Sequence, residues 1–223
     1  MTYIVGIDQS LTCTGIVAHI VDDDLEIVDT NIYFTTDILK HKQKGIINPI
    51  RIPKKLTGFE KIYNIYQAID YSKWSNGYFA SEAAAFGASG KLWDLGGIAA
   101  VLQAKALDYG MSIQTYAPNT VKLYATSKGS GDKLRIFQKF MTEDTPLTRE
   151  ILSYFPPNPT PKTDILNDLI DAWYIAELLL TEVRLRKGMI RLQNLPEWVI
   201  QIFNTVRGKD KVNILGREML RKL

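Results

Sequence analysis

The stretch that decides the fold is TYIVGIDQSLTCTGIVAHIVDDDLEIVDTNIYF, residues 2–34. It contains three runs rich in β-branched and aromatic residues, YIVGID (3–8), TGIVAHIV (14–21) and LEIVDTNIYF (25–34). Short polar connections separate the runs, and one of them is an acidic turn at 22–24. The pattern predicts three sequential strands that form an antiparallel meander.

Further along the chain, helical and strand patterns alternate. Apolar residues recur at helical spacing from Phe59 to Ile69, which predicts an amphipathic helix that ends near Trp74. The remaining predicted elements are a strand at the start of YFASEAAAF (78–86), a helix at about 91–109, a strand at 112–118, a short helix near 119–125, a helix from Lys133 and a long helix at about 163–186. This order predicts an α/β fold, a mixed five-stranded sheet with three antiparallel strands followed by two parallel ones, flanked by helices.

Length and composition place the chain among ordinary globular proteins. It has 223 residues, of which 46% are hydrophobic and 23% charged, and this excludes a disordered or disulfide-stapled chain. Cys13 is the only cysteine, so an intramolecular disulfide is impossible. We expect a main domain at 1–186 and a basic helical C-terminal extension at 187–223. No apolar run reaches the roughly 18 residues that span a bilayer, so we expect a soluble, intracellular protein with no membrane partner.

Charge is distributed unevenly. Residues 1–37 hold seven acids and no base, and residues 38–61 hold seven bases and one acid. Residues 184–223 hold ten bases and three acids. Such segregation is typical of proteins that meet a polyanion on one surface, although solvated basic faces also occur without nucleic acid.

Four carboxylates occupy positions that a mixed sheet can bring together. Asp8 ends the first strand, Glu82 follows a short buried run, and Asp168 and Asp171 share one helix face. Taken singly, Asp8 and Glu82 are more often a turn or cap aspartate and a helix-opening glutamate, and Asp168 and Asp171 are also readable as a solvated stripe. Together they would repel, because each like pair costs on the order of 4 kcal/mol at ~4 Å and an effective dielectric of ~20. Two Mg²⁺ ions would relieve this repulsion and support phosphodiester hydrolysis.

Four motifs together resemble the RuvC-like Holliday junction resolvases of the ribonuclease H-like superfamily. They are GIDQSLTCTG (6–15), SEAAAF (81–86), PNTVKLYATSKGSGDK (118–133) and NDLIDAWYIA (167–176). The resemblance implies a ribonuclease H-like sheet and a catalytic, metal-binding set formed by Asp8, Glu82, Asp168 and Asp171.

The resemblance also implies an activity. A homodimeric, structure-selective endonuclease would resolve four-way DNA junctions by paired hydrolysis, with two Mg²⁺ ions per site that Mn²⁺ can replace. Lys133 would offset the developing negative charge. The implied location is a bacterial or phage-infected cytoplasm, or an organelle.

The implied DNA contacts lie mostly in the third motif. They are Lys122, Lys128, Lys133, Arg135 and, after the second acid, Phe86. Glycines at 129 and 131 would let backbone amides approach phosphates, but the same loop is also readable as an exposed mobile segment. Phe86 is equally readable as a core residue.

Two other functions stay open at this point. The first motif also resembles the phosphate loop of sugar kinases and actin-like ATPases, but those enzymes need two such domains around a nucleotide, and we expect no nucleotide cofactor here. The second alternative is a module that binds branched DNA without cutting it. It predicts that the protein binds branched DNA without cutting it and that this binding does not require a metal ion.

Overall fold

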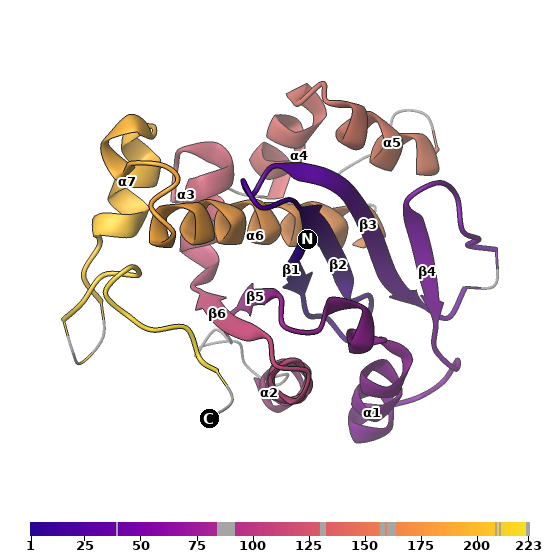
Figure 1. The fold of residues 1–223 in the computed structure, drawn as a ribbon. Helices are drawn as coiled ribbons and strands as arrows, with labels where there is room; N and C mark the ends of the chain where they lie inside the picture. Colours follow the sequence, from indigo (N-terminus) through magenta and orange to yellow (C-terminus); the bar gives the residue numbers. More distant parts are fainter. Residues whose placement is uncertain are drawn as a thin grey trace.

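The computed structural model describes residues 1–38, 40–83, 92–129, 133–156, 159, 164–207, 209 and 211–221, with the side chains of 92–95 and 164 left out. A six-stranded sheet forms its centre (Figure 1). The strands are β1 (Thr2–Asp8), β2 (Gly15–Val21), β3 (Ile27–Thr36), β4 (Ile47–Arg51), β5 (Tyr78–Glu82) and β6 (Ser112–Tyr116). Their order is β4-β3-β2-β1-β5-β6, and β2 alone runs antiparallel to its neighbours.

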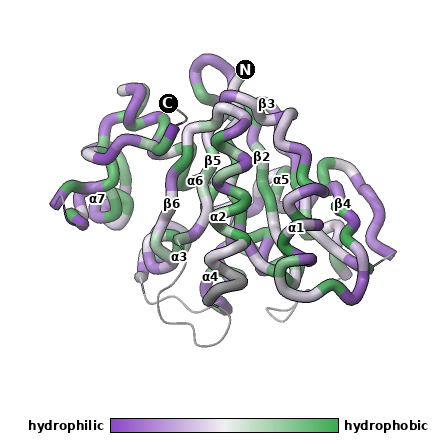
Figure 2. Tube along the Cα trace, turned by 90° about the horizontal axis from the view of Figure 1, so that it is seen from below, coloured by the Kyte–Doolittle hydropathy of each residue, from purple (hydrophilic) through white to green (hydrophobic). Residues whose placement is uncertain are grey.

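Helices cover both faces of the sheet. They are α1 (Gly58–Ala68), α2 (Leu92–Asp108), α3 (Pro118–Thr126), α4 (Lys133–Thr142), α5 (Pro146–Tyr154), α6 (Asp164–Arg186) and α7 (Glu197–Asn204), with 3-10 turns η1 (Tyr71–Trp74) and η2 (Leu192–Asn194). Figures 1 and 2 show α1 and α2 side by side on one face, opposite α6. Alternation along β1 produces this layering, because Val5 and Ile7 are buried with α1 and α2 whereas Ile4 is buried with α6.

The sheet confirms the mixed α/β prediction and corrects its strand count from five to six. The added strand, β4, lies in the basic segment and pairs in parallel with β3 at the sheet edge. Pro49 within this strand lacks a backbone donor, and such a residue is tolerated on an edge strand. Because a proline within a run argues against a strand, the sequence pattern did not predict β4.

Two helix predictions also needed correction. The helix expected to reach Trp74 ends at Ala68, and the Asp70 carboxylate accepts a hydrogen bond from the Ser72 amide to start η1. Helix α5 was not predicted, although Thr145 and Thr148 form a reciprocal capping box around Pro146 at its start.

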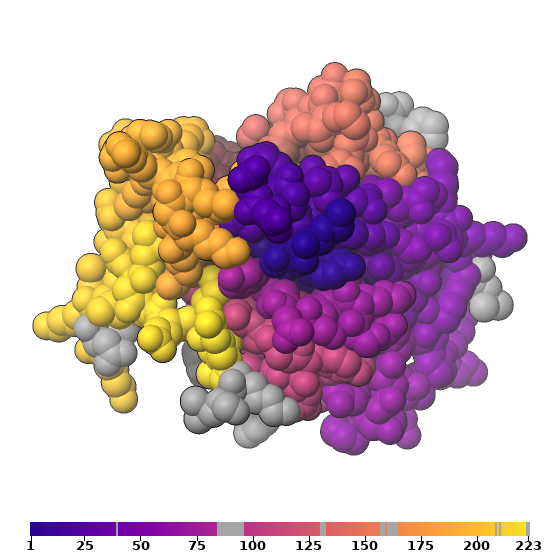
Figure 3. Space-filling view, viewed as in Figure 1, coloured from indigo at the N-terminus to yellow at the C-terminus, as the bar shows by residue number. Residues whose placement is uncertain are grey.

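The C-terminal segment packs on the body of the domain (Figure 3). Ile202 and Phe203 of α7 are buried in the same core as α6, and Leu220 forms a β-bridge with Ile113. Helix α7 is the helical part of this segment, and between residues 205 and 221 the described residues form turns and bridges. The boundary at 186 therefore stays a prediction, since the two parts share one core.

A buried carboxylate ties this segment to the sheet. Glu182 on α6 is fully buried and accepts hydrogen bonds from Tyr116 Oη at 2.7 Å and Gln114 Nε2 at 2.8 Å. It also pairs at 2.7 Å with Arg186, and the guanidinium of Arg186 donates to the Ile214 and Arg217 carbonyls.

None of the helices in the described ranges is long and apolar enough to cross a membrane.

Candidate active site

Two of the four carboxylates lie on neighbouring strands. Strands β1 and β5 pair in parallel with Ile7 opposite Ser81, so the next residues, Asp8 and Glu82, end their strands at the same edge of the sheet. Both side chains are partly buried. The strand-end spacing that the sequence predicted therefore places this pair of acids together.

Helix α6 brings the other two acids, and two glycines let it approach. A Cβ on Gly6 would lie 2.4 Å from the Ala172 carbonyl oxygen, and one on Gly15 would lie 2.4 Å from the Asp168 carbonyl oxygen. Gly15 pairs directly with Asp8 across β1 and β2. Because Gly6 and Asp8 share one face of β1, Asp8 points to the side of the sheet on which α6 lies. The helix residues nearest to it are those around Asp168 and Asp171.

The four carboxylates act on one another electrostatically. Burial raises the pKa of Asp8 well above its ordinary value, and the charges of Asp171, Asp168 and Glu82 raise it further. Burial followed by the charge of Asp171 raises the pKa of Glu82 to about 7. Burial also raises the pKa of Asp171 to about 6. Burial therefore makes the largest contribution to all three shifts, and the charges of neighbouring acids add to those of Asp8 and Glu82.

Two lysines oppose this accumulation of negative charge. Lys133, the first residue of α4, lowers the pKa values of Asp8, Glu82 and Asp171. Lys122 on α3 lowers those of Glu82 and Asp171. Lysines whose charges act on these carboxylates would also attract an anion bound beside them.

The remaining predicted DNA contacts are Lys128, Arg135 and Phe86. Lys128 and Arg135 are exposed near the same α3–α4 connection, and neither is among the groups that shift the carboxylate pKa values. Phe86 lies outside the described residues. All three stay predictions.

Sequence reasoning missed residues that support the site rather than carry charge. Gln9 Nε2 donates to the Glu82 carbonyl at 2.7 Å and so ties the ends of β1 and β5 together. Gln103 Nε2 contacts Ser81 Oγ at 3.1 Å and links α2 to β5. The signal for close helix approach was present as two glycines, one on each of two adjacent predicted strands.

The donor set suits a hard divalent cation. Oxygen ligands are those that Mg²⁺ prefers, and a bound cation would favour the charged form of these buried acids and offset the repulsion that contributes to the raised pKa values of Asp8 and Glu82. Among the residues that the structure describes, no group of three or more histidine, cysteine, aspartate or glutamate side chains is arranged so that it could hold a metal ion as it stands. The metal site and its ligands therefore stay a prediction.

The order of strands and the helix across the face define a protein class, the ribonuclease H-like α/β fold. Within that class the chain has the fold of RuvC. It is similar to the solved structure of Thermus thermophilus RuvC in complex with a Holliday junction substrate, with a TM-score of 0.50, 18% identity and coverage of 85% of this chain and 98% of that chain. A second structure, Thermus thermophilus RuvC, has a TM-score of 0.47 and 16% identity, and covers 84% of this chain and 98% of its own.

Comparison at the sequence level found no counterpart. No family model matches the chain, and no curated protein matches it. The similarity to RuvC is therefore one of fold.

Proposed function

We propose that this protein is a divalent-metal-dependent endonuclease that cuts branched DNA, in particular four-way junctions, and acts as a homodimer. The observation that carries the proposal is the gathering of Asp8, Glu82, Asp168 and Asp171 at one end of β1, β5 and α6, where burial raises the pKa values of Asp8, Glu82 and Asp171 and neighbouring acids raise those of Asp8 and Glu82 further. A fold shared with RuvC supports the same proposal.

The four carboxylates would hold Mg²⁺, two ions per site, with Mn²⁺ as a substitute. When bound, the ions would supply an activated water and would neutralise charge on the phosphate. The carboxylates orient this chemistry because β1, β5 and the glycine-lined contact with α6 fix their backbones. Two strands and a helix would hold the carboxylates in one fixed geometry, and such positioning of reacting groups speeds a reaction.

The basic residues near the carboxylates would contact the DNA phosphates. Lys133 would offset negative charge that develops on the phosphate, and its electrostatic effect on three of the acids supports this role. Lys122, Lys128 and Arg135 would contact neighbouring phosphates, with Phe86 at the branch point. Phosphate contacts of this kind position the protein without reading the base sequence.

Branched DNA is the proposed substrate because the RuvC structure of the same fold is described in complex with a Holliday junction. A four-way junction presents two strands of matching geometry on opposite sides. A homodimer with two-fold symmetry would place one site on each strand and so make paired cuts.

The direct test is cleavage of a labelled synthetic four-way junction in Mg²⁺. We expect the wild-type protein to cut two opposed strands, and Asp8→Asn and Asp168→Asn to bind the junction without cutting. Asp23→Asn is the matched control, because Asp23 is exposed in the turn after β2, at the opposite end of the sheet. Metal-independent binding with no cleavage by any variant would identify a binding module instead.

A separate measurement tests the dimer. Sedimentation of the Asp8→Asn protein is expected to give twice the mass of the 223-residue chain, and with a junction present it should give that mass plus the mass of one junction. On a plasmid cruciform, paired cutting gives linear product directly. Nicked circles that accumulate first would contradict a dimer that cuts both strands in one encounter.

A further inference from the structure

Helix α1 exposes a row of stacked aromatic rings. Phe59 and Tyr63 are 76% and 51% exposed, and their ring centroids lie 6.4 Å apart at an interplanar angle of 25°. Tyr63 in turn stacks on Tyr66 at 6.5 Å and 23°. We call these three rings the α1 ladder. An exposed phenylalanine ring in such a row costs hydration free energy, and neither the core nor the candidate active site uses it.

The ladder begins at the edge of the sheet that carries Asp8. Strand β4 runs parallel to β3 and β1, so its last residue, Arg51, lies at this edge, and α1 starts seven residues later at Gly58. From there α1 leads back toward the start of β5 at the opposite edge. Three strand spacings separate β4 from β1, about 14 Å, which is roughly the axial length of four base pairs.

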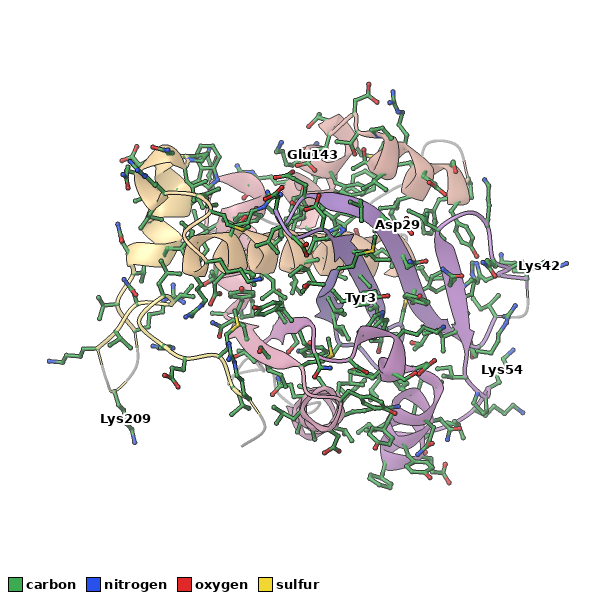
Figure 4. All side chains as sticks on the ribbon, viewed as in Figure 1. Tyr3, Asp29, Lys42, Lys54, Glu143 and Lys209 are labelled. Carbon is green, nitrogen blue, oxygen red and sulfur yellow. The ribbon has the colours of Figure 1, made fainter. Side chains whose placement is uncertain are left out.

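Basic residues surround the start of the ladder. Lys54 and Lys55 are exposed in the connection between β4 and α1. Figure 4 shows Lys42 and Lys54 projecting from the body beside β4. Glu60 is the only carboxylate in residues 38–69, against seven lysines and arginines. This charge favours a polyanionic partner over a second copy of the same basic surface.

The ladder is held in place from behind. Ile62 and Ile65 on the opposite side of α1 are buried against the sheet. The Lys105 ammonium lies 4.4 Å from the Tyr66 ring centroid and donates to the Ile69 carbonyl at 2.7 Å. Two aromatic side chains with few rotatable bonds on a fixed helix lose little entropy when a flat ligand stacks on them.

We propose that the α1 ladder, with Lys54 and Lys55, binds unpaired bases and their phosphates on a DNA strand that leaves the active-site edge. The inference rests on the proposed function, since it places the strand relative to the same carboxylates. Every base has a π-face on which an aromatic ring can stack, whereas paired bases in a duplex hide theirs. The surface would therefore favour branch points with unpaired nucleotides over perfectly paired junctions.

The test compares binding by the full chain carrying Asp8→Asn, so that no cleavage interferes. The probes are a labelled 20-nucleotide oligothymidylate, a fully paired four-way junction, and the same junction with unpaired thymidines and one 2-aminopurine at the crossover. Phe59→Ala/Tyr63→Ala removes the ladder, Phe59→Trp preserves stacking, and Tyr109→Ala is the control. Tyr109 is 36% exposed and follows α2 at the opposite edge of the sheet.

We expect the double variant to bind oligothymidylate and the unpaired junction at least about tenfold more weakly, and the fully paired junction almost unchanged. Quenching of 2-aminopurine should occur with the wild-type ladder and with Phe59→Trp, and should be lost in the double variant. Unchanged affinity, or an equal loss on all probes, would overturn the inference. So would loss of the dimer on sedimentation with DNA binding intact, because the ladder would then contact a second copy.

This outcome is separable from the proposed function. Cleavage of the fully paired junction by the double variant on an otherwise wild-type background tests the carboxylates alone. If that cleavage persists while the binding difference is absent, only the ladder inference fails. If wild-type protein never cleaves but the ladder difference is present, only the nuclease proposal fails.

Discussion

A Cβ atom added to Gly15 would lie 2.4 Å from the carbonyl oxygen of Asp168, so no side chain fits at this position unless the backbone moves. The contact joins the start of β2 to the part of α6 that bears two of the four acids. Glycine at this position is thus a requirement of the site as well as of packing.

Gly15→Ala is therefore expected to push α6 away from the sheet and to destabilise the protein by about 1–3 kcal/mol or more. Urea denaturation measures the loss, and junction cleavage should fall further than stability alone explains. Gly96→Ala is the control, since a Cβ there meets nothing within 4 Å, and a helical alanine should stabilise by roughly 0.5–1 kcal/mol. Equal stability of the two variants would contradict the close approach of α6.

Stability without metal should decrease with rising pH. The folded-state pKa of Glu82 is raised to about 7 and that of Asp171 to about 6, so the folded form holds these protons more tightly than the unfolded chain does. The resulting stability is complete below the ordinary carboxylate pKa of about 4 and is lost as pH rises to about 7. Two shifts of about two pKa units each, at ~1.4 kcal/mol per unit, make this loss roughly 5 kcal/mol.

Denaturation in EDTA at pH 5, 6, 7 and 8 checks this dependence. Asp8→Asn should flatten the profile because it removes a carboxyl whose own pKa burial and the neighbouring acids raise well above its ordinary value. Adding Mg²⁺ should raise the melting temperature more at pH 8 than at pH 5, because the ion binds the deprotonated acids. A profile in EDTA that is level from pH 5 to 8 would show that the acids do not interact as described.

Lys133→Ala should lower the rate of junction cleavage by about 100-fold, as removal of one electrostatic stabiliser typically does. Its charge also lowers the pKa values of Asp8, Glu82 and Asp171, so the acidic limb of the pH–rate profile should move to higher pH. Lys73→Ala, an exposed lysine of η1, is the control. A rate loss without a displaced pH profile would point to DNA binding alone.

Phe203→Ala tests whether the C-terminal segment is part of the main core. Phe203 is fully buried, and its truncation should cost about 3–5 kcal/mol while unfolding remains a single transition. Trp198→Ala on the same helix is the control, because Trp198 is 38% exposed. Two separate transitions in the Phe203 variant would instead support an independent extension after residue 186.

Much of the sheet was predictable because its strands carry their own signals. The runs that became β1, β2 and β3 are β-branched and apolar, and the acids Asp8 and Glu82 end strands that the pattern located. Parallel neighbours end at a common edge, so the proximity of these two residues follows from sequence order. Placement of Asp168 and Asp171 on one helix face needed only the helical period.

Other features depend on contacts that one-dimensional patterns do not encode. Strand β4 contains Pro49, which is tolerated because β4 lies at the edge of the sheet and pairs with β3 alone. The C-terminal segment follows its path because Arg186 on α6 donates to the distant Ile214 and Arg217 carbonyls, while Glu182, one helical turn earlier, accepts from the Arg186 guanidinium. The α1 ladder has the spacing of any amphipathic helix, and only the fold shows that its aromatic rings face outward.

The contact of Gly6 and Gly15 with α6 joins the first fifteen residues to a helix that begins at Asp164. During synthesis on the ribosome, the helical partners of Asp8 therefore emerge only after residues 164–186 have been made. We expect nascent chains that stop short of α6 to be unable to cut DNA, so the proposed cutting activity would arise only after this helix has been synthesised.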